Sequence, residues 1–507
     1  MSLDGALSVA SSGVANIARE LAIVSRNVAN ANTPDYAREV SNQISLTADG
    51  VGMGVAGRPS SRDIDTHLQE QVFQQGGLVA GLLTSQGALG AIDAAQGSPG
   101  KGDDLSSILG KLQDAFATLQ GDPASQAQQA KVVDAAGALT GKVNALSAAY
   151  GAARQSAQDG IVADVKSANA DIGVIGKLSA EIVGLRATGQ GTVDLENQRD
   201  AAMRGLSAVT GVRFLEQPNG DMLAVAAGGL FLPLHDAAPL TTADAVAGTG
   251  ASYPSGGIPA ITLRGMDVTP QLRGGSLGAR IALRDATLPK FQAQLDQFAQ
   301  TLASRFDRQG LTLFTDPSGA VPSATGVPVQ SGYVGFAGII QVNPAVAASA
   351  ALVRDGTHSV VGGPGGASAF SPSAAGGPAG FTGLIARVLD FALGSQAQAG
   401  VAQPGVATTG LGPTGTLAAG FTAPSDLAGF AATLVSAQSQ DSAAVSAKLT
   451  DETALQTNLQ GRLSSGAAVS IDTEMSTMLQ LQNAYGANAR ILTTAQSMWS
   501  QLLAAVT

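Results

Sequence analysis

The stretch LDGALSVASSGVANIARELAIVSRNV, residues 3–28, places apolar or small side chains at regularly alternating intervals of four and three residues. This heptad spacing predicts a helix with one face that packs continuously against another helix. The positions of this seam are Leu3, Leu7, Ala10, Val14, Ile17, Leu21, Val24 and Val28. An ordinary amphipathic core helix has the same spacing, so core packing and assembly between copies are both compatible with it.

The other end of the chain repeats this spacing on two stripes of one predicted helix. The first stripe is Ile471, Met475, Met478, Gln482, Tyr485, Ala489, Leu492, Gln496, Trp499, Leu503 and Val506. The second is Leu481, Ala484, Asn488, Ile491, Ala495, Met498 and Leu502. A helix with two such stripes needs neighbours on two sides. We expect the N-terminal helix to cover one stripe, and another copy or a related subunit to cover the other.

The composition of the 507 residues excludes several kinds of site. Cysteine is absent, which excludes disulfides, thiolate zinc sites and cysteine nucleophiles. The three histidines, His67, His235 and His358, are far apart, so neither a histidine metal site nor any other metal or cofactor is expected. A net charge of −10 without a basic patch argues against nucleic acid as a partner.

The same composition bears on the cellular compartment. No uninterrupted run of about 18 apolar residues occurs, so no membrane-spanning helix is expected. The start of the chain lacks the basic residues and apolar run of a cleaved signal peptide. The sequence therefore predicts a cytoplasmic protein, or one exported by a route that needs no such peptide.

The expected fold is mainly α with a smaller β part. Residues 1–36 and 470–507 are expected to pair as a coiled-coil assembly domain. A long helical bundle domain is expected from residues 37–210, 276–310 and 425–469. A β-hairpin segment is expected at 211–275, with its turn at Asn219-Gly220. Residues 311–424 are rich in Gly, Pro and Ala and are expected to form mostly loops.

Within these parts the pattern predicts individual helices and strands. Strand-like stretches occur in 37–60 and 212–272. Helices are predicted over 63–89, interrupted at Gly76-Gly77, and over 103–120, 123–187, 193–209, 277–309, 381–393 and 425–463.

Two patterns suggest chemistry, but their contexts argue against it. Residues 52–57, GMGVAG, match a dinucleotide fingerprint, yet Arg58-Pro59 follows instead of an apolar helix. Residues 274–278, GGSLG, match a nucleophile elbow around Ser276, with Asp355 and His358 later in the chain. Those two lie three residues apart in a glycine-rich loop, so we favour a turn at Gly274-Gly275 with Ser276 capping the next helix. A serine hydrolase using Ser276 stays a remote alternative.

Residues 25–38, SRNVANANTPDYAR, mark the end of the first predicted helix, because a helix does not continue through Thr33-Pro34. This string resembles the N-terminal signature of bacterial flagellar axial proteins, the rod, hook and hook-associated family. The usual form is Asn-x-Ala-Asn-x-Asn-Thr-Pro-Gly-Tyr-x-Arg. The matching residues are Asn27, Ala29, Asn30, Asn32, Thr33, Pro34, Tyr36 and Arg38, and Asp35 stands where glycine is usual.

Other stretches resemble the same family. Residues 471–475, IDTEM, and 480–490, QLQNAYGANAR, are similar to its C-terminal signature, with Thr473 in place of one acid. Residues 194–200, DLENQRD, and 274–289, with GGSLG and LRDATLP, resemble the hook-associated branch, at the first junction between hook and filament. Larger members of this branch carry a sizeable β domain after the helix that ends near Gln309. This chain offers only about 311–332 there, so the outer domain is expected to be reduced or missing.

The resemblance implies a structural, non-enzymatic subunit that joins hook to filament, with another axial subunit (hook, distal rod or second junction protein) as the alternative. It implies a ring of copies that contacts the hook protein and the second junction protein. An export chaperone is expected on the C-terminal helix, and no membrane insertion. The subunit would leave the cell through the flagellar type III apparatus. The expected assembly residues are Leu3, Leu7, Val14, Ile17, Leu21, Val24, Val28, Asn27, Asn30, Asn32, Tyr36, Met475, Met478, Tyr485, Asn488, Leu492 and Trp499.

Overall fold

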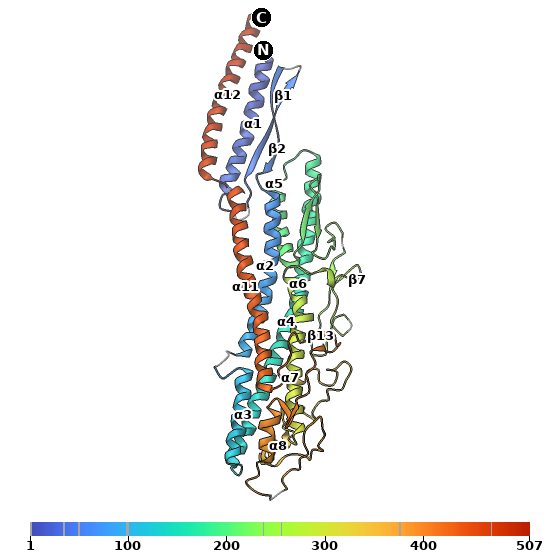
Figure 1. Cartoon of the computed structure of the whole chain (residues 1–507). Helices are drawn as coiled ribbons and strands as arrows, with labels where there is room; N and C mark the ends of the chain where they lie inside the picture. The colour runs from blue at the N-terminus through green and yellow to red at the C-terminus, as the bar shows by residue number, and fades with distance from the viewer. Residues whose placement is uncertain are drawn as a thin grey trace.

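A computed structural model describes residues 3–33, 36–48, 51–97, 101–236, 238–254, 256–374, 377–467 and 469–506. The molecule is long and narrow, with both chain ends at the same tip (Figure 1). The mainly α fold expected from the sequence is confirmed, with long helices and small two- and three-stranded sheets. Pro34 and Asp35 of the signature lie outside the described residues.

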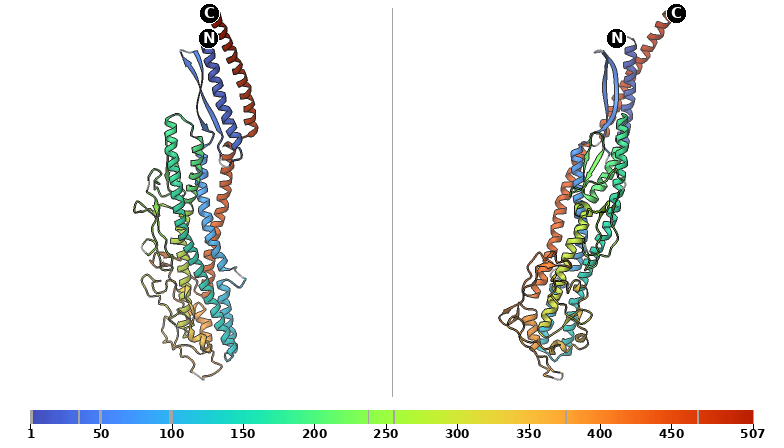
Figure 2. Two further views of the ribbon diagram at one scale, coloured as in Figure 1. Left: turned by 180° about the vertical axis from the view of Figure 1, so that it is seen from behind. Right: turned by 90° about the vertical axis from the view of Figure 1, so that its right-hand side faces the viewer.

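Four elements form the tip, which we call the terminal unit. Helix α1 (Leu3–Asn30) runs antiparallel beside α12 (Ile471–Val506), and a hairpin of β1 (Glu39–Ala48) and β2 (Val51–Arg62) lies along α1. The views from behind and from the side show the same arrangement (Figure 2). The sequence assigned residues 37–62 to the helical domain, whereas here their hairpin accompanies α1.

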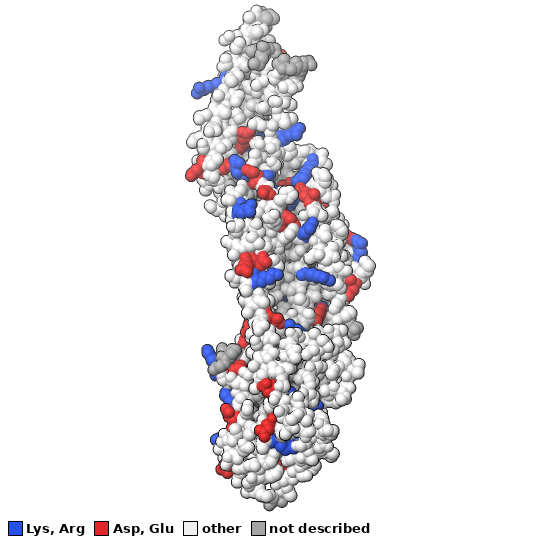
Figure 3. Space-filling view, in the orientation of Figure 1, with Lys and Arg blue, Asp and Glu red and all other residues white. Residues whose placement is uncertain are grey.

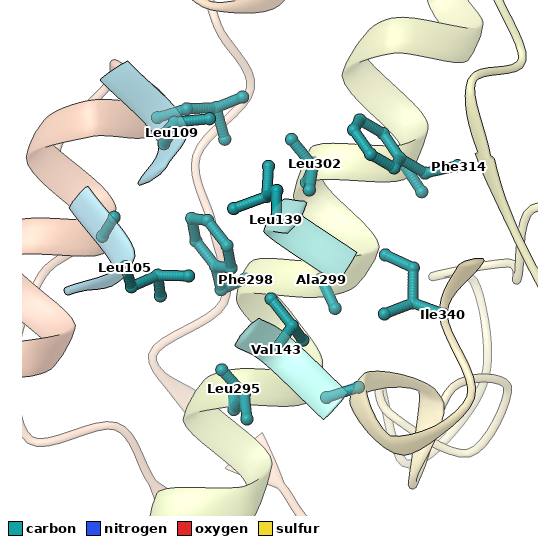
Figure 4. Close-up of a cluster of buried hydrophobic side chains, with 14 of the residues drawn as sticks. Leu105, Leu109, Leu139, Val143, Leu295, Phe298, Ala299, Leu302, Phe314 and Ile340 are labelled. Atoms are coloured by element: carbon teal, nitrogen blue, oxygen red, sulfur yellow. The ribbon is translucent and has the colours of Figure 1, made fainter. Parts of the chain in front are cut away.

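The body below the terminal unit is a bundle of long helices. They are α2 (Thr66–Gln96), α3 (Leu105–Gly121), α4 (Gln126–Ala187), α5 (Val193–Thr210), α6 (Gly275–Ala282), α7 (Leu288–Arg308) and α11 (Leu427–Ala467). One core joins α2, α4, α5 and α6 to the hairpin of β3 (Arg213–Glu216) and β4 (Met222–Val225). A second core lower down joins α3, α4, α7 and α11; Figure 4 shows Phe298 of α7 between Leu105 of α3 and Leu139 of α4, and Leu302 of α7 next to Leu139. The hairpin turn at Asn219-Gly220 is as predicted.

The remaining body elements are short. The strands are β5 (Leu240–Thr241), β6 (Thr262–Leu263), β7 (Met266–Asp267), β8 (Phe314–Thr315), β9 (Gln341–Val342), β10 (Gln396–Gln398), β11 (Val401–Ala402), β12 (Thr409–Leu411) and β13 (Leu417–Ala418). The short helices are η1 (Thr269–Gln271), η3 (Phe336–Gly338), α8 (Pro344–Ala348), α9 (Leu352–Asp355) and α10 (Gly383–Arg387), followed by a π-helical turn, η4 (Val388–Ala392). Residues 311–424 fold onto α7: Leu313, Phe336 and Leu384 are buried in the lower core.

The structure corrects three details of the predicted helices. Helix α2 continues without a break through Gly76-Gly77. The reason for glycine at position 77 is packing: an added Cβ would lie only 2.6 Å from the Ser207 carbonyl oxygen of α5. The helix predicted at 277–309 contains a π-helical turn, η2 (Leu283–Thr287), between α6 and α7. The N-cap of α6 is Gly274, and Ser276 lies inside the helix rather than capping it.

Buried glutamines connect α11 to three other helices of the body, α2, α4 and α7. The Gln438 side chain accepts hydrogen bonds from Gln96 of α2 (2.5 Å) and the Tyr150 hydroxyl of α4 (2.7 Å), and donates to Gln294 of α7 (2.9 Å). Each of these side chains is almost fully buried. A buried polar network of this kind fixes the register of the helices, because a shifted helix would leave these groups unpaired. The network therefore fixes the first part of α11 against α2, α4 and α7.

Two helices are long and apolar enough to cross a membrane by length and composition alone, α1 over Asp4–Asn30 and α2 over Thr66–Gln96. The sequence expectation of no membrane-spanning helix counted only uninterrupted apolar runs, whereas this test averages hydropathy over a window of 18 residues and allows up to two charged residues. Both helices have protein neighbours: α2 packs on α5, α6 and α11, and α1 on α12 and the hairpin. Helices packed inside a protein pass the same test, so no membrane partner follows from it.

Candidate functional site

The α1–α12 pair forms the centre of the terminal unit. Of the predicted seam on α1, Ile17 and Val24 are buried, Val14, Leu21 and Val28 are partly buried, and Leu7 at the tip is exposed. The side chain of Leu3 lies outside the described residues. The helices approach closely at Gly13, where an added Cβ would lie 3.3 Å from the side-chain oxygen of Asn488 on α12.

The other face of α1 holds the hairpin through polar side chains. Asn16 donates to Gln43 of β1 (2.6 Å), and the Val55 amide of β2 donates to the Ser12 hydroxyl (3.2 Å). The hairpin is antiparallel, with Leu46 opposite Gly54. Helix α1 is therefore the middle layer of the terminal unit, between α12 and the hairpin.

Asn27 of the N-terminal signature is the hub that connects these layers. Its amide nitrogen donates to the Glu39 carbonyl oxygen, and its amide oxygen accepts from the Glu39 backbone N–H, both at 2.9 Å. Thus one side chain pairs both backbone groups at the first residue of β1. The Tyr36 hydroxyl donates to the same amide oxygen (3.0 Å). Asn27 is 1% exposed, so each of these bonds is shielded from water.

Glu474 brings α12 to the same point. Its carboxylate accepts from Arg38 Nε at 2.7 Å and from Asn27 Nδ2 at 3.3 Å, although Asn27 lies 447 residues away in the chain. Glu474 is 1% exposed and lies in the first turn of α12, where a carboxylate also faces the favourable end of the helix dipole. The Arg38 backbone N–H donates to the Ala467 carbonyl at the end of α11 (3.1 Å). The two signatures thus meet in one buried contact.

Arg26 and Tyr36 complete this cluster. Arg26 forms a two-pronged ion pair with Glu39, with nitrogen–oxygen distances of 2.9 and 2.7 Å, and this contact raises the pKa of the arginine. The Ser60 hydroxyl of β2 also donates to Glu39. Burial, followed by the charge of Glu39, raises the pKa of Tyr36 to about 12, so its hydroxyl keeps the proton that it donates to Asn27.

The other predicted signature residues have weaker contacts. Asn30 donates to the Arg26 carbonyl (3.0 Å) and accepts from the Thr33 hydroxyl (3.3 Å), which closes the end of α1. Asn32 is exposed. Sequence reasoning did not place Arg26, Glu39 or Glu474 in the site. A signal existed for Glu474, because α12 carries few charged residues.

Helix α12 keeps many large apolar side chains in contact with solvent. Asn488, Met478 and Leu492 are partly covered, and Ala495 is buried. Exposed are Ile471, Met475, Leu479, Tyr485, Ile491, Met498, Trp499, Leu502 and Leu503, with Trp499 at 46% and Leu502 at 61%. We call these nine residues the bare face of α12. Near the tip Trp499 lines a groove together with Asp4, Leu7, Ala495 and Gln496.

Charge is scarce around the bare face. From Met475 to Val506 the helix has one charged residue, Arg490. The space-filling view shows the upper part of the molecule largely without charged side chains, and a concentration of both signs where it meets the body (Figure 3). An exposed apolar surface of this extent is typical of a protein–protein contact.

The described residues gather no metal or nucleophilic centre. No group of three or more His, Cys, Asp or Glu that could hold a metal ion occurs among them. Ser276 donates to Asp164 (2.8 Å), while His358 lies against Thr312 and Asp355 pairs with Arg354. The nucleophile-elbow pattern therefore comes without a serine–histidine hydrogen bond.

Family models match two separate parts of the chain. Residues 89–319 match the helical domain of the flagellar hook-associated protein FlgK, and residues 459–505 match the C-terminal region of the flagellar basal body rod FlgEFG proteins. Together these matches cover more than half of the chain, including α12. Both matches support a FlgK-like flagellar hook-associated protein. The family expected from the two terminal signatures is thus confirmed.

One solved structure similar to this FlgK-like chain is the flagellar hook junction protein FlgK from Burkholderia pseudomallei, at 24% identity and a TM-score of 0.41. The match covers 50% of this chain and 45% of that protein, so it spans less than half of the relative's length. A search of curated proteins found no match. The family is one of flagellar structural proteins, and the chain is a flagellar component.

Proposed function

We propose that this chain is a non-enzymatic structural subunit that joins the flagellar hook to the filament. The observation that carries this proposal is the bare face of α12, beside a strip that α1 already covers, in a chain whose family consists of flagellar axial proteins. Exposure of Trp, Tyr and Leu side chains to water raises the free energy of the free subunit. Association with a neighbour covers this apolar surface and is therefore favourable.

The proposed assembly site is the terminal unit, residues 3–62 and 469–506, rather than the terminal helices alone. It includes the expected seam of α1, the signature residues Asn27, Asn30, Asn32 and Tyr36, and Met475, Met478, Tyr485, Asn488, Leu492 and Trp499 of α12. The body, residues 63–467, has two cores of its own and serves as the outer part of the subunit. The proposed partners of the bare face are further copies in a ring, the hook protein and the second junction protein.

Export is the other part of the proposal. A subunit at this place would leave the cell through the flagellar type III apparatus. Before assembly the bare face of α12 would promote aggregation in the cytoplasm, so we propose that an export chaperone binds it.

The location tests the proposal against other axial roles. The chain has no cysteine, so Gln190→Cys, at an exposed position in the turn between α4 and α5, gives a single labelling site. Gold-labelled flagella from a complemented deletion strain should show one narrow band at the hook–filament boundary. Label spread along the hook, the rod or the filament would refute a junction role and favour another axial subunit.

Paired substitutions test the bare face itself. Leu502→Glu puts a charge at the most exposed position of the bare face, away from the groove shared with α1, and we expect hooks without filaments and flagellin shed into the medium. Gln501→Glu is the matched control, since it places the same acid at a neighbouring exposed polar position, about 100° round the same helix. Equal swimming of both variants would show that the bare face is not an assembly surface. Assaying the culture supernatant for each variant separates failed export from failed joining.

A further inference from the structure

The terminal unit and the body are joined at few places. The chain crosses between them at residues 63–65, after β2, and near residues 467–470, between α11 and α12. In addition, β2 contacts α5 of the body, and the Arg38 backbone N–H of the terminal unit donates to the Ala467 carbonyl at the end of α11 (3.1 Å). The direction in which the terminal unit points therefore depends on what holds these crossings in place.

Arg62, the last residue of β2, makes the β2–α5 contact. Its Nε donates to Glu196 at 2.9 Å, and its Nη1 bonds to Asp200 and, at 3.4 Å, to Asn197. These three partners occupy positions i, i+1 and i+4 of α5, so one guanidinium reaches across a full turn of the helix. The side chains of Arg62, Glu196 and Asp200 are 8%, 9% and 7% exposed.

The receiving carboxylates are held in place by the body. Glu196 also accepts from the Thr192 hydroxyl (2.6 Å) and from Arg186 (2.8 Å), and Asp200 accepts from Gln69 of α2. These bonds orient the two carboxylates independently of Arg62. The two carboxylates thus form a preorganised binding site on the body for the Arg62 guanidinium of the terminal unit.

This contact differs from the packing on either side of it. The two cores of the body are formed by residues that do not include Arg62, and the terminal unit is held together by its own contacts around Asn27. Loss of the Arg62 contact would therefore leave both parts folded while removing a fixed link between them. The concentration of charge at this level is visible in Figure 3.

We infer that Arg62 is a positioning residue: its insertion between Glu196 and Asp200 sets the direction of the terminal unit on the body. Arginine suits this role because its planar guanidinium bonds two carboxylates at fixed angles. The importance of this direction for joining hook to filament rests on the proposed function. The contact itself belongs to the isolated chain and is tested there.

Distances between spin labels test the inference. In the cysteine-free chain, Ser45→Cys on the hairpin and Gln190→Cys on the body, both at exposed positions, carry the labels. We expect one main label–label distance in the otherwise unchanged chain and a broadened or shifted distribution in Arg62→Gln. Arg62→Lys, which keeps the charge, should restore much of the original distribution. Arg58→Gln is the matched control, an exposed arginine on the same strand, and should change nothing.

A second readout separates positioning from general stability. Arg62→Gln leaves the carboxylates of Glu196 and Asp200 buried without this cation, so the thermal midpoint of the body, followed by circular dichroism, should fall by a few degrees while the body still melts as one folded unit. An unchanged distance distribution in Arg62→Gln would overturn the inference, and so would a broad distribution in the parent chain or a large loss of body stability. All of these measurements use the isolated chain, so their outcome is independent of whether copies assemble at the hook.

Discussion

Replacing Asn27 by alanine should open the terminal unit without unfolding the body. The amide of Asn27 pairs both the N–H and the C=O of Glu39 and accepts from the Tyr36 hydroxyl. Without it, two buried backbone groups at the start of β1 lose their partners. Each such group costs about 1–3 kcal/mol, so the terminal unit should lose about 2–6 kcal/mol.

Amide hydrogen exchange measures this loss directly. At 1.4 kcal/mol per factor of ten, exchange of the amides in β1 and in the second half of α1 should become at least about 30-fold faster. Amides in the core helices α4 and α7 should keep their protection, because their cores contain no contact with Asn27. In the cell, Asn27→Ala should leave hooks without filaments.

Asn30→Ala is the matched control for this prediction. Asn30 belongs to the same signature, but it bonds at the partly exposed end of α1, to the Arg26 carbonyl and the Thr33 hydroxyl. Its loss should cost less than about 1 kcal/mol. If Asn27→Ala exchanges no faster than Asn30→Ala, the idea that Asn27 holds the layers together is wrong. Faster exchange throughout the body would show that the terminal unit and the body form one cooperative unit.

Three further changes test other parts of the structure. Leu21→Asp places a carboxylate in the partly buried seam of α1 and should cost several kcal/mol in the terminal unit, so filaments should not attach while the body melts normally; global unfolding of the purified variant would contradict this. Burial raises the pKa of Asp296 from 3.8 to about 7, so the folded state holds a proton that the unfolded state releases, and the free energy of unfolding should fall as the pH rises from about 4 to about 7. Asp296→Asn should abolish this slope in denaturant titrations, and an unchanged slope would assign it to other groups. Gly77→Ala should destabilise the body by about 1–3 kcal/mol, because the added methyl meets the α5 backbone, whereas Gly87→Ala in the same helix has open space and should stabilise it by about 0.5–1 kcal/mol; thermal melts of the pair that do not differ would contradict the packing argument.

The paired terminal helices could be predicted because their information is local. Seam spacing on α1 and the two stripes on α12 are read within single segments, and the hairpin at Asn219-Gly220 is specified by its turn residues. The predicted interruption at Gly76-Gly77 was wrong because the role of Gly77 depends on a contact with another helix. Gly77 looks like an interruption in isolation, and only the approach of α5 shows why the helix needs it.

The polar contacts of the site depend on pairings that one segment cannot reveal. Asn27 and Glu474 are 447 residues apart, and no periodicity links an arginine at the end of β2 to two acids on α5. The packing of residues 311–424 onto α7 was hidden as well, because Gly- and Pro-rich composition indicates turns but not what they cover.

The contact between Asn27 and Glu474 joins the first helix of the chain to the last, so the terminal unit can be completed only after the whole chain has been synthesised. Synthesis delivers α1 first and α12 after nearly everything else, so the body can fold before the terminal unit has its second helix. A chain broken off anywhere in α11 would keep the elements of the upper body core and the hairpin beside α1, but α1 would lack its partner helix α12 and the chain would have no bare face. Under the proposed function, competence to join is thus the last property that the molecule acquires, and an incomplete chain would lack the surface needed to join.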